Sequence, residues 1–161
     1  MIEIIPLSGV APDRVEALLD AAFGADRKAR TAYKLRAGAV AIPALSFAAM
    51  QGEALVGSLQ SWPVRVAGQS VTLIGPVAVS PERQRSGIGQ MLMERLITAA
   101  GDAPMMMIGD PEYYGRFFGF TADATAAWDV PGPVERHRLL ARQVPAGLAG
   151  AVGPDLRALA A

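Results

Sequence analysis

The chain has 161 residues, of which 52% are hydrophobic and 19% charged, and its fifteen Lys and Arg balance fifteen Asp and Glu. This composition is globular, and the zero net charge argues against a protein whose main task is holding a nucleic-acid backbone. With no cysteine and one histidine, disulfides and a cysteine nucleophile are excluded, and a zinc site has almost no ligands.

A single domain over residues 1–161 is the expectation for this length. The most apolar stretch, residues 37–50, is interrupted by Gly38, Pro43 and Ser46. It is too short to span a bilayer, which needs about 20 residues. No signal peptide is apparent at Met1. We therefore expect a cytoplasmic protein with no membrane or nucleic-acid partner and no bound metal.

The first part of the chain predicts one strand and two helices. Residues 2–6 are apolar enough for a short strand. Residues 12–23 carry apolar side chains every three or four positions, with Pro12 at the start and Gly24 past the end, as in an amphipathic helix. Asp26 is expected to cap a second helix that reaches about Arg36.

The period of the hydrophobic pattern then changes from that of a helix to that of strands. Residues 45–50, 53–66 and 71–79 read as three strands separated by short glycine-containing turns. The third strand contains Gly75 and Pro76. Because proline cannot donate to a sheet ladder, we expect a bulge or a break in pairing there.

A strand–helix–strand unit follows. A polar loop at residues 80–86 leads into a helix over residues 87–100 and a buried parallel strand at 105–108. The predicted buried face of the helix consists of Ile88, Met91, Leu92, Leu96 and Ala99. Beyond an aromatic segment at 113–120, residues 126–130 and 137–144 predict further strands.

The most informative stretch is the turn into this helix, which reads Gln84, Arg85, Ser86, Gly87, Ile88, Gly89 and Gln90. Glycines in a first helical turn let a ligand approach the backbone closely. The free N–H groups and the helix dipole then form an anion site. A ligand that carries phosphate is the expected partner.

Two common phosphate-binding motifs do not match this stretch. No run in the chain has the P-loop pattern G-x-x-x-x-G-K-[ST]. A dinucleotide fingerprint needs a third glycine where Leu92 stands, and its glycines follow the strand at once, whereas seven residues separate Val79 from Gly87. Asp110 does stand about 20 residues on, where a ribose-binding acid could lie.

The stretch from Gln84 to Gly89 matches the Q/R-x-x-G-x-G/A motif of the GNAT (N-acetyltransferase) superfamily, which the chain resembles in context too. The resemblance implies an α/β (α+β) fold. Its mixed, mostly antiparallel sheet would have six or seven strands with one splayed parallel pair, flanked by about four helices.

The same resemblance implies direct transfer of an acetyl group from acetyl-CoA, a co-substrate, to the amine of a small-molecule or peptide acceptor. The pyrophosphate would lie on the N–H groups of about Arg85 to Gln90. Val77 and Val79 would offer backbone groups to the pantetheine arm. Pairing of edge strands could give a homodimer.

Members of the family often protonate the departing thiolate with a tyrosine, and here the candidates are Tyr114 first and Tyr113 second. The alternative is that both rings simply pack beside the cofactor. The base that deprotonates the amine stays open among Glu53, Asp20, Glu16 and a water molecule, since residues 71–79 contain no acid. This gap leaves a second interpretation open, a catalytically inactive acyl-CoA-binding sensor.

Three other residues have an alternative interpretation. Trp62 and Trp128 could line an acceptor pocket, or could simply be half-buried strand residues. His137 stands among charged residues and is expected at the surface.

Overall fold

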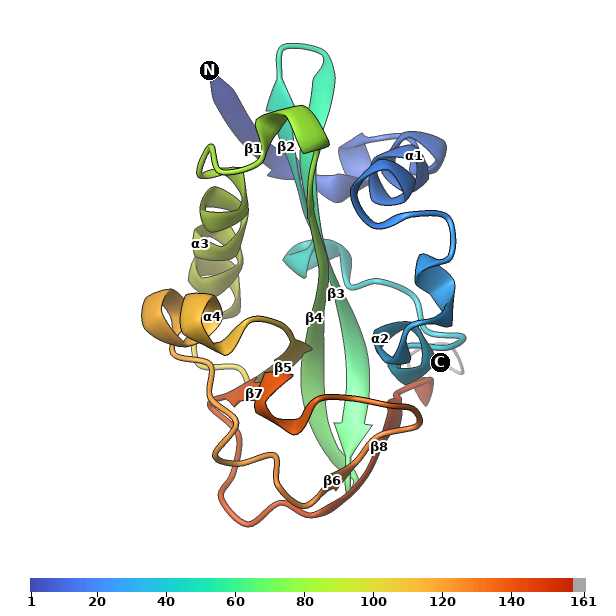
Figure 1. The fold of residues 1–161 in the computed structure, drawn as a ribbon, viewed down its shortest axis with the longest axis vertical. Helices are drawn as coiled ribbons and strands as arrows, with labels where there is room; N and C mark the ends of the chain where they lie inside the picture. The colour runs from blue at the N-terminus through green and yellow to red at the C-terminus, as the bar shows by residue number, and fades with distance from the viewer. Residues whose placement is uncertain (158–161) are drawn as a thin grey trace. The chain divides into compact units, whose positions relative to one another are not determined.

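The computed structural model describes residues 1–157, and its elements follow the order expected from the sequence (Figure 1). The strands are β1 (Ile2–Pro6), β2 (Phe47–Gln51), β3 (Ala54–Val66), β4 (Gln69–Val79), β5 (Met105–Ile108), β6 (Trp128–Asp129), β7 (Leu139–Arg142) and β8 (Gly150–Pro154). The α-helices within these residues are α1 (Pro12–Phe23), α2 (Thr31–Leu35), α3 (Ile88–Ala100) and α4 (Pro111–Phe118).

The eight strands form a mixed, mostly antiparallel sheet. Its main path is β1-β2-β3-β4-β5-β7, and β8 pairs with both β3 and β6. Strands β4 and β5 are parallel and pair only at Thr72 with Met105 and at Leu73 with Met106, although both strands continue further. The described residues thus confirm the fold class and a parallel pair whose pairing is short.

The chain folds into two compact units. The first unit contains Met1–Lys28, Ala41–Ser61 and Pro76–Gly101. The second contains Ala29–Val40, Trp62–Gly75 and the chain from Asp102 onward. Strands β3 and β4 each contribute residues to both units. A single domain remains a prediction from chain length.

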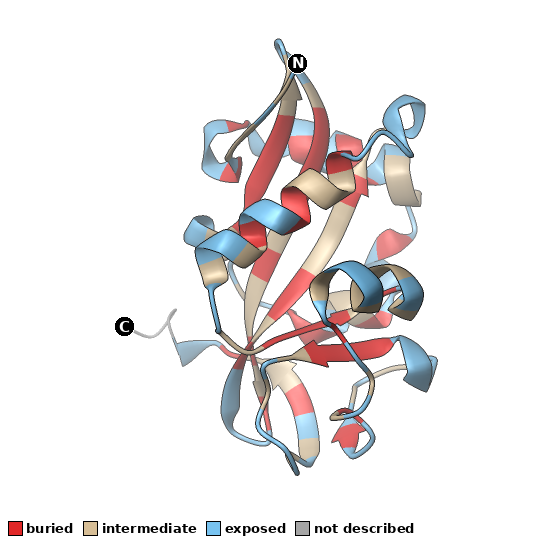
Figure 2. Cartoon of the chain, turned by 90° about the vertical axis from the view of Figure 1, so that its left-hand side faces the viewer, coloured by how far each residue is buried: buried red, intermediate tan, exposed pale blue. Residues whose placement is uncertain are grey.

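In the first unit, α1 and α3 cover opposite faces of the strands (Figure 1). Helix α1 has the bounds that its apolar spacing predicts, with Pro12 in its first turn and Gly24 at its C-cap. Its buried residues are Val15, Leu18 and Leu19. They pack with residues from the segment before the helix and from the strands: Leu7, Val10, Ala48 and Ala78. Helix α3 likewise buries one stripe and exposes the other (Figure 2).

The second unit has a separate core around the fully buried Trp128, which packs with Leu73, Met106 and Leu139. Met105, Met106 and Met107 are all buried, as expected of a core strand. Thr125 Oγ1 donates to the Leu139 carbonyl at 2.7 Å and so satisfies a buried hydroxyl beside this core.

Three local predictions were wrong. The second helix is broken into a 3-10 turn, Arg27–Ala29, and the short α2, because Arg30 adopts an extended ψ of 150°. The N-cap of α2 is Arg30 and not Asp26. On α3, Met93 is buried, whereas Met91 is only half-buried and Ala99 is exposed. Strand β8 was missed, because glycine and proline dominate its sequence.

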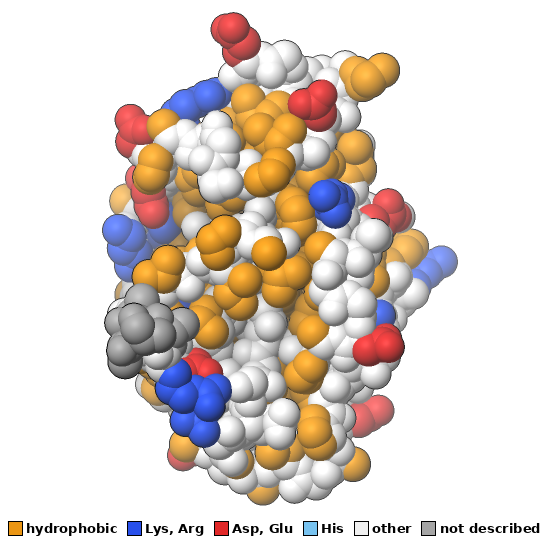
Figure 3. All heavy atoms as spheres, turned by 180° about the vertical axis from the view of Figure 1, so that it is seen from behind, with side chains coloured by type: hydrophobic (Ala, Val, Ile, Leu, Met, Phe, Trp, Pro, Cys, Tyr) orange, Lys and Arg blue, Asp and Glu red, His pale blue; other side chains and the backbone are white. Residues whose placement is uncertain are grey.

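Among residues 1–157, no helix is long and apolar enough to cross a membrane. On the face drawn in Figure 3, Lys and Arg side chains stand in small separate groups among acidic and apolar ones. That face therefore carries no broad basic surface.

Candidate functional site

The turn into α3, residues 84–90, belongs to the first unit and has two left-handed residues. Arg85 has φ +66° and Gly87, the N-cap of α3, has φ +85°. An ideal Cβ on Gly87 would meet nothing within 4 Å, so the conformation, and not lack of space, calls for glycine. Between them, the Ser86 hydroxyl donates to the Arg83 carbonyl and closes the turn.

This conformation leaves the start of α3 open to an anion. No side chain caps the helix, and an α-helix leaves the N–H groups of its first turn without partners inside the helix. Residues 81–87 are exposed, while Ile88 is only 2% exposed and anchors the turn. Gln90 donates to the Glu94 carboxylate at 3.1 Å, one turn further along the helix.

Ile88 is anchored through a glycine that the sequence analysis did not single out. An ideal Cβ on Gly57 of β3 would stand 2.7 Å from Cγ2 of Ile88 and 3.2 Å from Cδ1 of Leu92. Glycine here lets α3 approach the strand. A lone glycine inside a strand pattern is the signal that could have identified this position.

Val77 and Val79 lie in the last part of β4, also in the first unit. Both are half-buried and point to the same face, while Ala78 between them is buried on the other face among residues of α1. Their backbone lies in an extended strand.

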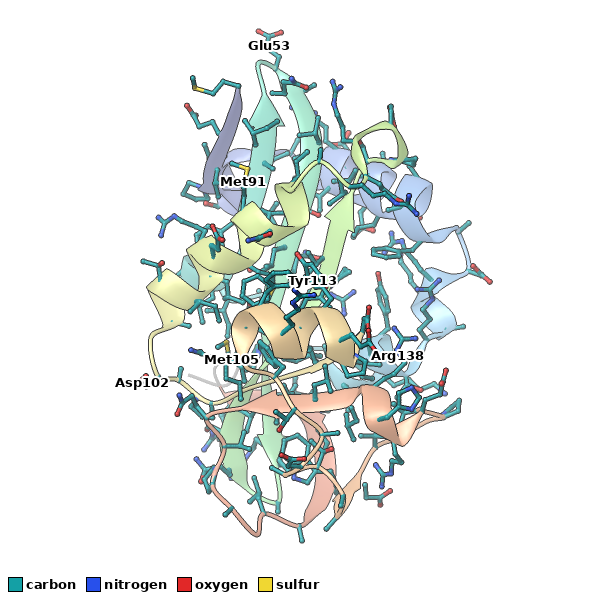
Figure 4. The ribbon with its side chains drawn as sticks, turned by 60° about the vertical axis from the view of Figure 1, so that its left-hand side comes forward. Glu53, Met91, Asp102, Met105, Tyr113 and Arg138 are labelled. Carbon is teal, nitrogen blue, oxygen red and sulfur yellow. The ribbon has the colours of Figure 1, made fainter. Side chains whose placement is uncertain are left out.

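The two candidate tyrosines belong to the second unit, on α4. Asp110 caps this helix by accepting from the Glu112 N–H at 3.0 Å, and Gly119 closes it in a left-handed conformation. Tyr113 and Tyr114 contact each other edge-to-face, with ring centroids 4.9 Å apart. Figure 4 shows Tyr113 on α4 and Arg138 in the segment before β7.

Gly109, just before α4, makes room for the Tyr114 ring. An ideal Cβ at this position would be 2.8 Å from Cε2 of Tyr114. Gly109 and Arg138 also exchange hydrogen bonds: the Gly109 N–H donates to the Arg138 carbonyl at 3.0 Å, and Arg138 Nε donates to the Gly109 carbonyl at 3.3 Å. Tyr114 therefore packs against the backbone of Gly109, and a larger residue at position 109 would collide with its ring.

The protein-family comparison agrees with this geometry. The model of the acetyltransferase (GNAT) family matches residues 13–120, a range that includes both the α3 turn and the tyrosines. The chain belongs to the GNAT family. No curated protein matches the chain significantly.

Solved structures of other GNAT proteins share the fold. The GNAT family N-acetyltransferase YhbS from Escherichia coli, solved in complex with CoA, is 25% identical with a TM-score of 0.70, covering 99% of this chain and 91% of its own. A GNAT family acetyltransferase from Brucella melitensis, solved in complex with acetyl-CoA, is 26% identical with a TM-score of 0.64, covering 96% of each chain. Both are matched over nearly their whole length.

Of the three carboxylates considered as the base, two form ion pairs and the third is exposed in this GNAT chain. Glu16 and Asp20 of α1 both bind Arg27, which is 2% exposed; the Asp20 contact is 3.0 Å. Glu53 stands at the tip of the β2–β3 hairpin and points away from the sheet (Figure 4). None of the three lies free on a strand beside β4.

The remaining polar candidates lie at the surface. His137 is exposed, as predicted, and stands 3.6 Å from the Glu135 carboxylate. No group of three His, Cys, Asp or Glu side chains that could hold a metal ion exists within the part of the chain that the structure describes.

The electrostatics of Tyr114 give a testable pH dependence. Burial, aided by the neighbouring Tyr113 and Asp110, raises the pKa of Tyr114 to about 12, against an ordinary value of 10.0. Because the folded state favours the neutral phenol, this stabilisation is complete below pH 10 and is lost as the pH rises towards 12. Two pKa units correspond to about 2.7 kcal/mol.

Between pH 9 and pH 11.5, we expect the unfolding free energy of the wild-type protein to fall further than that of Tyr114→Phe. The difference should reach up to about 2.7 kcal/mol. Urea unfolding of both proteins at several pH values measures it. The same pH dependence of stability in both proteins would contradict the raised pKa of Tyr114.

Proposed function

We propose that this chain transfers an acetyl group from acetyl-CoA to the amine of a small-molecule or peptide acceptor, in the cytoplasm and in a ternary complex. The observation that carries the proposal is the turn into α3, with left-handed Arg85 and Gly87 before an uncapped helix, in a chain of the GNAT family. The CoA and acetyl-CoA complexes of the two similar structures support the choice of co-substrate.

The cofactor-binding groups of this proposal all lie in the first unit. The N–H groups from Arg85 to Gln90 would bind the pyrophosphate, which suits an anion at a helix start. Val77 and Val79 would offer backbone groups to the pantetheine arm. Their half-buried, extended strand fits this role.

In the chemical step, the amine nitrogen forms a bond to the thioester carbon and releases a proton to water, the C–S bond breaks, and the thiolate takes a proton. Tyr114 is the proposed donor of that proton, with Tyr113 the second candidate. A phenol whose pKa lies near 12 holds its proton at neutral pH. The phenolate left behind is strongly basic, because its pKa is raised, and it takes a proton back from solvent after each turnover.

The amine must lose its own proton before it attacks. An alkylamine with a pKa near 10.4 lies about three units from neutrality at pH 7, which costs about 4 to 5 kcal/mol. Because Glu16 and Asp20 bind Arg27 and Glu53 is exposed, we assign this step to a water molecule on backbone carbonyls.

The same lack of a free carboxylate supports a second candidate function, an acyl-CoA sensor that binds the thioester without transferring its acyl group. Release of CoA thiol across a panel of amines distinguishes the two. Binding of acetyl-CoA with no thiol release for any amine would favour the sensor.

The experiment for the co-substrate is thermal unfolding with and without acetyl-CoA. Ligand at 100 times its dissociation constant adds about 2.7 kcal/mol to the unfolding free energy. For a chain of this size we expect a rise in melting temperature of about 5 to 10 °C. Gly89→Glu places a carboxylate in the first turn of α3 and should abolish the rise.

Ala99→Glu is the matched control, since it adds the same charge at an exposed position near the other end of α3. It should keep the rise. No rise in wild-type protein at millimolar acetyl-CoA would overturn the proposed function. A rise that persists in Gly89→Glu would instead move the pyrophosphate away from this turn.

A further inference from the structure

Trp62 makes a hydrogen bond that ordinary strand packing does not require. It is half-buried in β3, and its indole Nε1–H donates to the carbonyl of Gly75 in β4 at 2.8 Å. Both residues belong to the second unit. A half-buried indole could have kept its N–H in water, so this bond ties the side chain to one backbone group.

Gly75 lies within β4 and has a backbone conformation that a regular strand does not have. Its φ of +132° is outside the range that side-chain-bearing residues favour, and an ideal Cβ there would meet nothing within 4 Å. The position therefore needs glycine for its backbone conformation alone. The pairing of β4 with β5 ends two residues earlier, at Leu73, and the next residue, Pro76, has no N–H to donate.

The Trp62 ring is itself held by α2. The guanidinium carbon of Arg36 lies 4.0 Å from the centroid of the Trp62 ring and 3.9 Å from that of Tyr33. Arg36 is only 9% exposed, so these cation–π contacts are largely shielded from water. Such contacts are strongest when water is excluded. The stack fixes the plane of the indole and with it the direction of its N–H.

We propose that Trp62 is a positioning residue for acyl transfer: through its indole N–H it fixes the Gly75 carbonyl and the irregular backbone of β4 that precedes Val77 and Val79. The proposal rests on the proposed function, which lays the acyl-pantetheine arm along those two residues. Displacement of this part of β4 would shift the thioester relative to the amine, and misplacement by about 1 Å can lower a rate about 100-fold.

The variant that tests this is Trp62→Phe, which keeps an aromatic ring for Arg36 and removes the N–H. We expect kcat to fall at least tenfold, while the KM for acetyl-CoA changes less than threefold. Trp128→Phe is the matched control, because Trp128 Nε1 also donates to a backbone carbonyl, that of Leu148 at 3.1 Å, within the same unit. It should keep kcat at temperatures where it is folded.

The two tryptophans, the chain's only ones, also give a spectroscopic test. In Trp128→Phe the indole emission comes from Trp62 alone, and saturating CoA should change its intensity or wavelength. In Trp62→Phe the emission comes from the fully buried Trp128 and should stay constant. A merely structural role for Trp62 would not produce this contrast.

The outcomes separate the inference from the function on which it rests. If wild-type protein binds and turns over acetyl-CoA but Trp62→Phe matches Trp128→Phe in kcat, the positioning role is overturned and the transferase stands. The same holds if CoA leaves the emission of Trp62 unchanged. If wild-type protein shows no acetyl-CoA-dependent stabilisation or no turnover with any amine, the transferase fails and the role of Trp62 with it.

Discussion

Tyr114→Phe is expected to lower kcat by about 100-fold while leaving the affinity for acetyl-CoA unchanged. The phenylalanine ring still fits against Gly109, where a Cβ would stand 2.8 Å from the tyrosine ring, so the packing of α4 is retained. What is lost is the proton for the departing thiolate. General acid catalysis contributes about 100-fold or more, equivalent to about 2.7 kcal/mol.

Steady-state kinetics and the acetyl-CoA-dependent thermal shift together measure this effect. Tyr113→Phe is the control, because its ring lies edge-on to Tyr114 in the same helix. It should change kcat less than threefold. Unchanged turnover in Tyr114→Phe would remove that residue from the mechanism, and a large loss only in Tyr113→Phe would exchange the two roles.

Gly57→Ala is expected to destabilise the protein by about 2 to 3 kcal/mol and to weaken acetyl-CoA binding. The added methyl group would lie 2.7 Å from Ile88 Cγ2 and 3.2 Å from the backbone oxygen of Ala78. Real Cβ contacts are not this short, and overpacking a core typically costs about 1 to 3 kcal/mol. Relief requires the first turn of α3 to move, and that turn carries the proposed pyrophosphate site.

Gly153→Ala is the matched control for a strand glycine. A Cβ there meets nothing within 4 Å, and the position is not in the left-handed region. Its effect should lie within about 1 kcal/mol in either direction. Urea unfolding compares the two variants, and equal stabilities would show that the approach of α3 to β3 is not as tight as described.

The sequence predicted the elements that its hydrophobic period and glycines mark. Helix α1 and strands β1 and β5 have the expected bounds, and the left-handed Gly87 agrees with the glycine-rich turn that the motif indicated. These features depend on neighbouring residues only, so local pattern is enough to find them.

Features that depend on distant residues were not predictable. Gly57 matters because the side chain of Ile88, from another element, leaves no room for a side chain at this glycine. The pairing of Arg27 with Glu16 and Asp20 likewise could not be read from spacing. The sequence therefore left these two acids as candidate bases, whereas in the structure both form ion pairs with Arg27.

Strand β8 implies an order of events during translation. It pairs with β3 at Val64, Arg65 and Val66, almost 90 residues earlier in the chain, and both valines are fully buried in the folded protein. On the ribosome these residues are made long before the strand that pairs with them, so their hydrogen-bonding edge stays open until β8 has been synthesised. Nascent chains stalled before residue 150 should therefore depend most strongly on chaperones.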